Sequence, residues 1–234
     1  MLEVKDLSKS FGNENVINNI SFTVEQGSVV GIIGKNGAGK STLISIIATV
    51  IEKFQGEIRV DRKNISNNLK EYRESLGYVP QEALVYEELT VKENIDFWNM
   101  HKSKELVNKI INVLELEPWM KKKAKTLSGG TKNRLNIAIG IINNPKIIVL
   151  DEPLVGISLT IKRNFFKLLK EFANEGKIIL ISSHEVLEMD DLCTDLLILK
   201  SGKLICYEKI HKIKKRCEEE NLNLWDYVCD LGGL

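Results

Sequence analysis

A glycine-rich segment that ends in a lysine and two hydroxyl residues is the part of the sequence best suited to bind an anion. It has the pattern G-x-x-x-x-G-K-[ST] over residues 34–41 and lies between apolar runs at 29–33 and 43–48. These runs predict a buried strand, a tight turn and a helix, which makes a chance match to a simple turn a weak alternative. The N–H groups of such a turn converge, and the helix adds the positive end of its dipole. We therefore expect a nucleoside-triphosphate site, with Lys40 on the β- and γ-phosphates and Ser41 on Mg²⁺.

Two adjacent acids follow the apolar run Ile-Ile-Val-Leu at residues 147–150. Such a run is typical of a strand that is buried on both faces of a parallel sheet. At the end of that strand, Asp151 suits the magnesium side of a site and Glu152 suits a base that polarises water. Acids that cap a helix are the alternative. It is weaker, because two carboxylates beside so apolar a strand are costly without a metal ion or water.

Two further polar side chains are expected at the same edge of the sheet. Gln81 follows a predicted strand at 76–79, and His184 follows an apolar strand at 178–181. Ligands of α/β sheets bind where the parallel strands end, so His184 is placed to donate to a γ-phosphate. Each residue alone is also compatible with an ordinary turn or surface position. The charged groups expected nearby are the reason to consider a functional role for them.

A second glycine-containing turn, Leu-Ser-Gly-Gly-Thr, occupies residues 127–131 before a predicted helix at 133–142. Such a helix start can bind an anion, although a plain capping turn also explains it. Phe11 is an aromatic residue in the turn 10–12, well before the phosphate loop. It is a candidate for stacking on a nucleobase, and the alternative is a residue of a small apolar cluster.

The remaining pattern predicts an α/β protein. Residues 2–33 contain short alternating strands, and residues 90–126 form a helical insertion between two sheet-forming halves. Thr90 begins this insertion as the cap of a Thr-x-x-Glu box. Apolar residues at helical spacing over 161–172 predict a helix on the sheet, and residues 196–206 predict a hairpin. From residue 207 onward the chain is charged and shows no recognisable chemistry.

Composition excludes several classes of protein. The chain has 234 residues, of which 43% are hydrophobic and 28% charged, as expected for a globular protein with a sizeable core. A net charge of +1 gives no electrostatic reason to expect nucleic acid or an anionic membrane as partner. The four cysteines have no C-x-x-C spacing and are expected to be reduced thiols of a cytosolic protein. Residues 1–6 lack the features of a signal peptide, and no apolar run is long enough to span a bilayer.

The order of these motifs resembles the nucleotide-binding subunits of ABC transporters over about residues 1–207. The phosphate loop alone is shared by many NTPases, whereas Leu-Ser-Gly-Gly shortly before the acidic strand is specific to ABC ATPases. The resemblance implies that Phe11 stacks on adenine, that Asp151 supports Mg²⁺ through water, that Glu152 activates water and that His184 contacts the γ-phosphate. It implies that Ser41 and Gln81 ligate Mg²⁺, with Glu152, His184 and Gln81 as the catalytic set. The implied ATP-binding residues are Phe11, Val16, Gly34, Asn36, Gly37, Ala38, Gly39, Lys40, Ser41, Thr42, Ser128, Gly129 and Gly130.

The same resemblance implies the organisation of the molecule. The fold is expected to be a P-loop NTPase core with a parallel sheet flanked by helices, an N-terminal antiparallel β subdomain and an α-helical subdomain that carries Leu-Ser-Gly-Gly. Residues 1–207 are expected to form the ATPase domain, with the helical subdomain at about 85–143, and residues 208–234 a short charged extension. Ser128 and Gly130 are expected to contact the ATP of a second subunit, either a copy of this chain or a homologous one.

The resemblance also implies a cellular location and a partner protein. The chain is expected on the cytoplasmic side of the cell membrane, bound to a separate integral membrane permease, with ATP and Mg²⁺ as cofactors. Its general likeness is to small bacterial subunits that serve export permeases, and no nucleic acid is expected. A soluble ABC ATPase that drives a non-membrane partner is the alternative, and an intact Glu152 and His184 disfavour a nucleotide-binding regulator without turnover.

Two positions depart from the family pattern. Thr131 stands where Gln or Met is common, and Ser158 stands where the family usually has Asp. Ser158 removes a carboxylate that is expected to couple the two sites of a dimer. This departure bears on the rate and symmetry of hydrolysis, whereas nucleotide binding is expected to be unaffected.

Overall fold

The computed structural model describes residues 1–100, 103–183 and 189–232. Within these residues, an N-terminal antiparallel sheet has the strand order β2-β1-β4-β5. Its strands are β1 (Leu2–Phe11), β2 (Glu14–Val24), β4 (Gln55–Val60) and β5 (Lys63–Asn64). The predicted antiparallel subdomain is confirmed, and Phe11 ends β1 at the turn before β2.

A second, mostly parallel sheet positions the acidic strand and the phosphate loop. In the described part of the chain its order is β10-β9-β3-β8-β7-β6, and only the pairing of β10 with β9 is antiparallel. The strands are β3 (Val29–Ile33), β6 (Leu76–Val79), β7 (Ile147–Leu150), β8 (Ile178–Ser183), β9 (Asp195–Lys200) and β10 (Lys203–Lys209). Because β3, β6, β7 and β8 run in parallel, the segments that follow them meet at one edge of the sheet.

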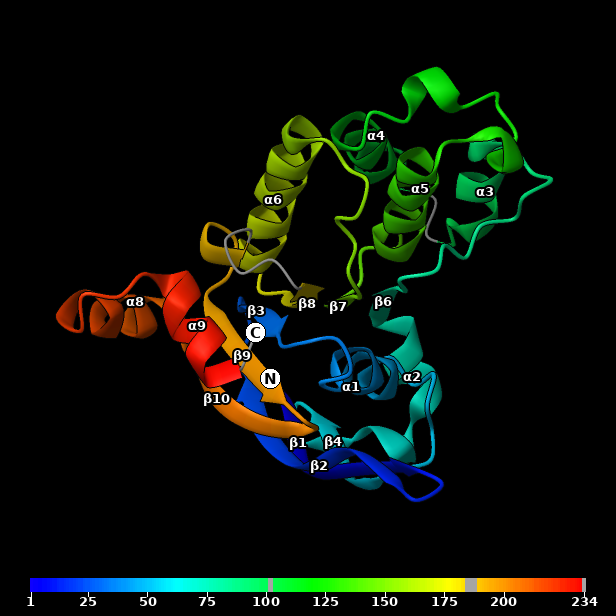
Figure 1. The fold of residues 1–234 in the computed structure, drawn as a ribbon. Helices are drawn as coiled ribbons and strands as arrows, with labels where there is room; N and C mark the ends of the chain where they lie inside the picture. The colour runs from blue at the N-terminus through cyan, green and yellow to red at the C-terminus, as the bar shows by residue number, and fades with distance from the viewer. Residues whose placement is uncertain (101–102, 184–188, 233–234) are drawn as a thin grey trace.

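Both faces of this sheet are covered, so every residue of the central strands β3, β7 and β8 is buried. Val30 and Ile32 of β3 pack toward the antiparallel sheet and helix α1 (Lys40–Ile47), whereas Val29 and Ile33 pack toward helix α6 (Leu159–Asn174). The short helix α2 (Leu69–Glu74) lies near α1 (Figure 1). This two-sided burial is the physical reason for the continuous apolar runs that predicted the strands.

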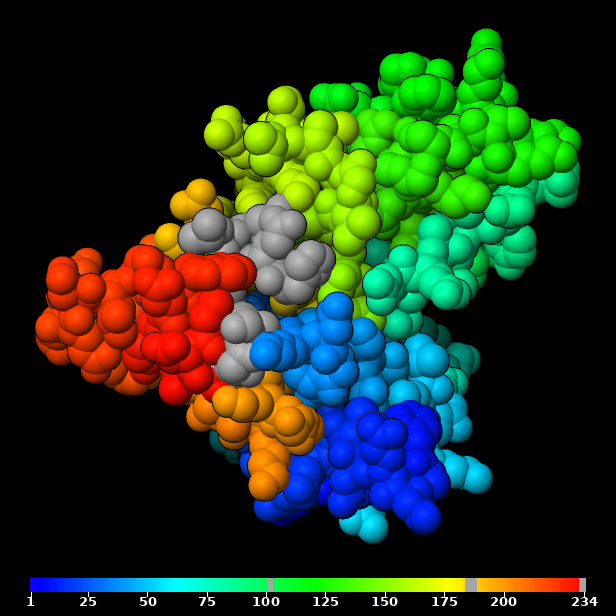
Figure 2. Space-filling model, viewed as in Figure 1, coloured from blue at the N-terminus to red at the C-terminus, as the bar shows by residue number. Residues whose placement is uncertain are grey.

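The helices α3 (Val91–Trp98), α4 (Lys104–Val113) and α5 (Gly129–Ile141) follow β6 and precede β7 in the chain. They gather at the end of the molecule opposite the antiparallel sheet, as Figures 1 and 2 show. The predicted capping box of Thr90 is present at the start of α3. Helix α5 begins at Gly129, four residues before the predicted start, because the side chain of Ser128 caps it.

Two helices form the end of the described chain, α8 (Ile210–Glu219) and α9 (Leu224–Gly232). The sequence pattern predicted only a charged segment here. Ile213 of α8 and Val228 of α9 are nevertheless fully buried, and both belong to the main apolar core. The two helices project from the side of the sheet that carries β9 and β10 (Figure 1).

Candidate functional site

The phosphate loop lies between β3 and α1, as predicted. Gly39 has a φ of 102°, in the left-handed region that residues with a Cβ rarely adopt. A Cβ at this position would also lie 2.9 Å from the carbonyl oxygen of Val16. The tight turn that directs backbone N–H groups toward one point therefore requires glycine here.

Lys40 is buried at the start of α1 and bends back over the loop. Its Nζ donates hydrogen bonds to the carbonyl oxygens of Gly34, at 2.8 Å, and Lys35, at 3.3 Å. The same Nζ lies 3.8 Å from Oε1 of Glu152. Burial lowers the pKa of Lys40, while the negative charges of Glu152 and Asp151 oppose that effect. The site thus places a desolvated ammonium group where a phosphate can bind it.

Asp151 connects the acidic strand to the phosphate helix. Its Oδ1 accepts hydrogen bonds from the hydroxyl of Ser41, at 3.2 Å, and from the hydroxyl of Ser182, at 2.7 Å. The side chain of Asp151 is buried, so these two hydroxyl groups fix its position. The serine hydroxyl and the carboxylate beside it together offer hard oxygen ligands, the type that Mg²⁺ prefers.

Glu152 is held in an unusual backbone conformation. Its φ is 45°, which is uncommon for a residue with a side chain, and its N–H donates to Ser182 Oγ at 2.8 Å. Strained backbone of this kind persists where the surroundings fix it, often at functional sites. Sequence reasoning missed Ser182. The available signal was its place at the end of β8, beside the end of β7, in the parallel register that pairs Leu150 with Ile181.

A cavity of about 650 Å³ opens over the loop and brings most of the predicted residues together. Its described lining is Val16, Gly34, Lys35, Asn36, Gly37, Gly39, Lys40, Ser41, Thr42, Gln81, Glu152 and Trp225. The predicted residues Phe11, Ala38, Asp151 and Ser128–Gly130 are not in this lining. The predicted residue His184 falls outside the described residues. Trp225, which no sequence motif indicated, is part of the cavity wall.

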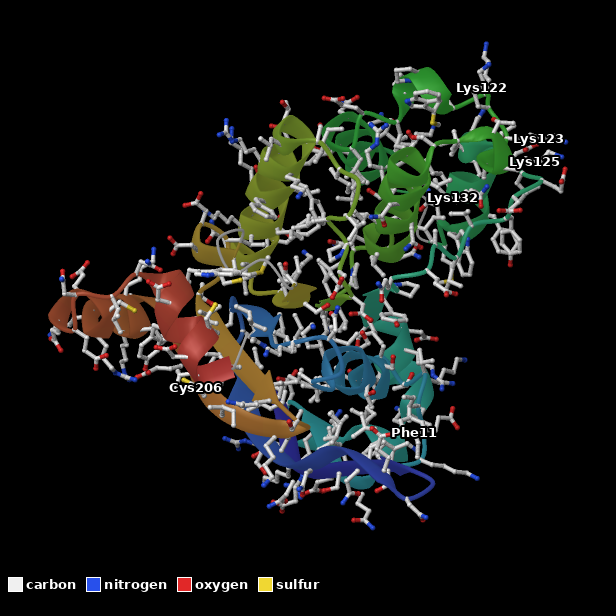
Figure 3. The ribbon with its side chains drawn as sticks, viewed as in Figure 1. Phe11, Lys122, Lys123, Lys125, Lys132 and Cys206 are labelled. Carbon is white, nitrogen blue, oxygen red and sulfur yellow. The ribbon has the colours of Figure 1, made fainter. Side chains whose placement is uncertain are left out.

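Phe11 lies on the surface at the end of β1 (Figure 3). Its side chain is 50% exposed, so the alternative that it belongs to an apolar cluster is wrong. Nζ of Lys9 lies 4.7 Å from the centroid of the Phe11 ring, within the range of a cation–π interaction. Base stacking by Phe11 stays a prediction.

The second glycine-containing turn is tied closely to the segment that follows Glu152. Gly130 approaches Gly156 so closely that a Cβ on Gly130 would lie 2.2 Å from the carbonyl oxygen of Gly156. Nδ2 of Asn133 donates to the carbonyl oxygens of Pro153, at 2.8 Å, and Val155, at 3.0 Å. The turn at Ser128 is therefore fixed relative to the acidic strand by packing and by hydrogen bonds.

The fold and the site define a P-loop NTPase. The site combines a phosphate loop, a serine hydroxyl beside a carboxylate (Ser41 and Asp151), and a second acid, Glu152, at the edge of the sheet. A family model described as ABC transporter matches residues 17–155. The uncharacterized ABC transporter ATP-binding protein MJ1023 of Methanocaldococcus jannaschii is 33% identical over 221 residues, covering 92% of this chain and 80% of the relative. The lipopolysaccharide export system ATP-binding protein LptB of Haemophilus influenzae is 31% identical over 214 residues, covering 88% of this chain and 89% of the relative. The chain belongs to the ABC transporter family, as an ATP-binding subunit that hydrolyses ATP and energises a transporter.

Solved structures agree with this assignment. The structure of an ATP-binding subunit of an ABC transporter aligns with a TM-score of 0.89 at 26% identity, covering 99% of both chains. The dimeric structure of a post-hydrolysis state of the ATP-binding cassette MJ0796, bound to ADP and Pi, aligns with a TM-score of 0.80 at 25% identity, covering 90% of this chain and 99% of that one. The predicted fold class, a P-loop core with an antiparallel β subdomain and flanking helices, is confirmed.

Proposed function

We propose that this chain binds Mg·ATP at the phosphate loop, hydrolyses it in a head-to-tail dimer and drives export through a separate permease. The observation that carries the chemistry is the pair of contacts at the sheet edge, Ser41 with Asp151 and Lys40 with Glu152. The first contact would supply donors for Mg²⁺, and the second places a cation beside the expected base. On this proposal residues 1–207 are the ATPase domain, with a helical subdomain at about 85–143.

The proposed roles follow from position and chemistry. The hydroxyl of Ser41 and the side chain of Gln81 would hold Mg²⁺, with Asp151 acting through water, and the ion would neutralise charge on the transferred phosphoryl group. Glu152 would accept a proton from the attacking water, since it lines the cavity and belongs to the end of the acidic strand. Lys40 would bind the β- and γ-phosphates. His184 keeps the γ-phosphate role that the family resemblance implies.

A dimer is proposed because one chain does not complete the site. Ser128, Gly129 and Gly130 form a helix start suited to an anion, yet they are not part of the described lining of their own cavity. A second copy turned head to tail would place this turn on the first copy's ATP. Val155 and Leu159 are exposed apolar side chains on either side of Ser158, and such a surface would suit a partner subunit. The structure of the MJ0796 cassette, a dimer bound to ADP and Pi, supports the formation of a dimer.

A permease would dock on an apolar surface of the helical region, made of Leu84, Tyr86, Phe97 and Met100, all of them exposed. We call this the aromatic surface. The rings of Tyr86 and Phe97 meet edge to face, with centroids 4.9 Å apart. Aromatic side chains of this kind are enriched at protein interfaces. The chain runs from Gln81, in the cavity, to the aromatic surface within a few residues, so docking and nucleotide binding would be coupled.

Four lysines gather on the same helical region, as Figure 3 shows for Lys122, Lys123, Lys125 and Lys132. Three of them pair with acids: Lys123 and Lys125 with Glu88, and Lys132 with Glu87. Ion pairs of exposed groups contribute little stability. Because acids offset this positive charge, we assign docking to the aromatic surface and give the lysines a solubilising role.

The membrane part of the transporter would come from another chain. No helix among the described residues is long and apolar enough to cross a membrane. Export is proposed because relatives include the lipopolysaccharide export protein LptB and a Nod factor export ATP-binding protein. On this proposal the chain lies on the cytoplasmic side of the membrane.

Co-purification from detergent-solubilised membranes tests the proposal. Phe97→Ser should reduce recovery of an integral membrane protein at least severalfold while basal ATPase activity of the isolated chain stays unchanged. Val50→Ser is the matched control, because Val50 is 61% exposed and Phe97 is 59% exposed, yet Val50 lies outside the aromatic surface. Recovery of only a non-membrane partner from wild-type chain would favour the soluble alternative.

A further inference from the structure

The C-terminal helix α9 contributes a side chain to the nucleotide cavity. Trp225 lines the cavity together with Lys35 and Asn36 of the phosphate loop. It is the one aromatic residue in the described lining, and most of the other lining residues are polar or glycine. Trp225 is 40% exposed, so part of the indole packs on protein and part faces solvent.

The position of Trp225 is set by the packing of α9. Val228 is fully buried in the main core, and α9 lies against β9 and β10. Figure 3 labels Cys206 of β10 beside this helix. Oδ1 of Asn223 accepts a hydrogen bond of 2.9 Å from the N–H of Asp226, which caps the helix start. Nη1 of Arg216 donates to the hydroxyl of Tyr227 at 3.0 Å. These contacts hold the indole in the cavity wall.

Cys229 is a second residue on the face of α9 that carries Trp225. Burial raises the pKa of the Cys229 thiol, Asp226 and Asp230 add to this effect, and the positive charge of Lys35 opposes it. Cys229 is four residues after Trp225, so the two residues share one face of the helix. Because Trp225 lines the cavity with Lys35 and Asn36, this face of α9 is directed toward the start of the loop.

We propose that Trp225 is a nucleotide-contacting residue and that α9 forms one wall of the ATP site. This inference rests on the proposed function only in that the cavity binds ATP. A flat ring in a cavity wall that Lys35 and Lys40 also line would exclude water from part of the cavity, which would strengthen charged hydrogen bonds to a phosphate. The ring also offers a face on which part of the nucleotide can pack.

Binding affinity tests the proposal directly. We expect Trp225→Ala to bind ATP about three- to tenfold more weakly than the wild type, and Trp225→Phe to bind within about twofold. Calorimetry in EDTA measures this without hydrolysis, and Trp119→Phe is the control for loss of an indole elsewhere. Unchanged or tighter ATP binding by Trp225→Ala, at an unchanged melting temperature, would overturn the proposal.

The affinity of the same variants for tripolyphosphate, which has no base or ribose, shows which part of ATP the ring contacts. A loss shared with ATP assigns the contact to the phosphates, and a loss for ATP alone assigns it to the base and ribose.

Fluorescence gives a second, independent readout. The chain has three tryptophans, so a Trp98→Phe, Trp119→Phe double variant emits from Trp225 alone. We expect saturable quenching or a spectral shift on adding ATP, and we expect the added change Lys40→Ala to abolish it at the same ATP concentrations. An emission spectrum that ATP leaves unchanged, in a variant shown to bind ATP, would overturn the proposal. If Lys40→Ala itself binds ATP normally, the phosphate-loop assignment has failed instead.

Discussion

Lys40 and Glu152 are neighbours in the cavity wall, with Nζ of the lysine 3.8 Å from Oε1 of the glutamate. The carboxylate of Glu152 opposes the lowering of the pKa of Lys40 by burial. Removing the negative charge of Glu152 therefore lowers the pKa of Lys40 further. The lysine expected to bind the phosphates and the acid expected to act as base therefore lie within direct electrostatic reach of one another.

The first prediction concerns Lys40. Lys40→Ala removes a charged donor from a buried anion site, so we expect ATP affinity to fall about ten- to a hundredfold while the fold stays intact. A binding titration measures the affinity and circular dichroism measures the fold. Lys53→Ala, at an exposed position outside the cavity, is the control for loss of one positive charge. Unchanged affinity in Lys40→Ala would refute the phosphate-loop assignment.

Phe11 provides a prediction about the base. If its half-exposed ring stacks on adenine, Phe11→Ala weakens ATP binding about tenfold, and Phe11→Tyr changes it little. Titrating both variants with ATP and with tripolyphosphate checks this, since tripolyphosphate has no base and its affinity is expected to be unchanged. Equal ATP affinities in the Ala and Tyr variants would reduce Phe11 to a surface partner of Lys9.

Ser158 is the test of subunit coupling. It precedes helix α6, its side chain makes no capping hydrogen bond, and it lies on the surface. Asp is a good residue for a helix start, so Ser158→Asp is expected to leave stability intact or raise it slightly. We expect it to change the hydrolysis rate or the Hill coefficient without altering ATP affinity, and Ser158→Asn separates charge from shape. If steady-state kinetics show neither change, the departure from the family pattern has no catalytic consequence.

The dimer prediction joins catalysis to assembly. Glu152→Gln keeps the shape of the side chain but removes the charge that polarises water, so bound ATP should persist between the subunits. We expect the wild type to be mostly monomeric without ATP and Glu152→Gln to become dimeric with Mg·ATP, as measured by light scattering.

The added change Ser128→Arg should abolish that dimer by filling the contact with the partner's ATP. Ser128 also caps α5, so Ser128→Ala, which removes the cap without adding bulk, controls for a loss of stability. A Glu152→Gln protein that binds ATP and stays monomeric at high concentration would contradict the head-to-tail arrangement.

The sequence predicted those parts of the site that depend on residues close together in the chain. The phosphate loop and the strand before Asp151 each depend on a local pattern, and parallel pairing alone brings them to one edge. Ser182 was missed because its contact with Asp151 depends on the register of β7 against β8, which no local pattern encodes.

The C-terminal helices were missed for a different reason. In α8 the buried residues, such as Ile213, are separated by charged side chains, so the segment looked polar. Helix α9 is mostly apolar but short, and no motif marked it. Trp225 then reaches the cavity only because α9 packs on β9 and β10. Tertiary packing of this kind cannot be read from periodicity alone.

The contact between Gly130 and Gly156 has a mechanical consequence. Backbone atoms in direct contact resist compression, and the two hydrogen bonds from Asn133 to Pro153 and Val155 resist separation. Helix α5 and the segment after Glu152 are therefore expected to move together as one rigid unit. A movement of the segment after Glu152 would therefore be transmitted to α5, whereas any side chain at Gly130 would force the two apart and strain the hydrogen bonds from Asn133.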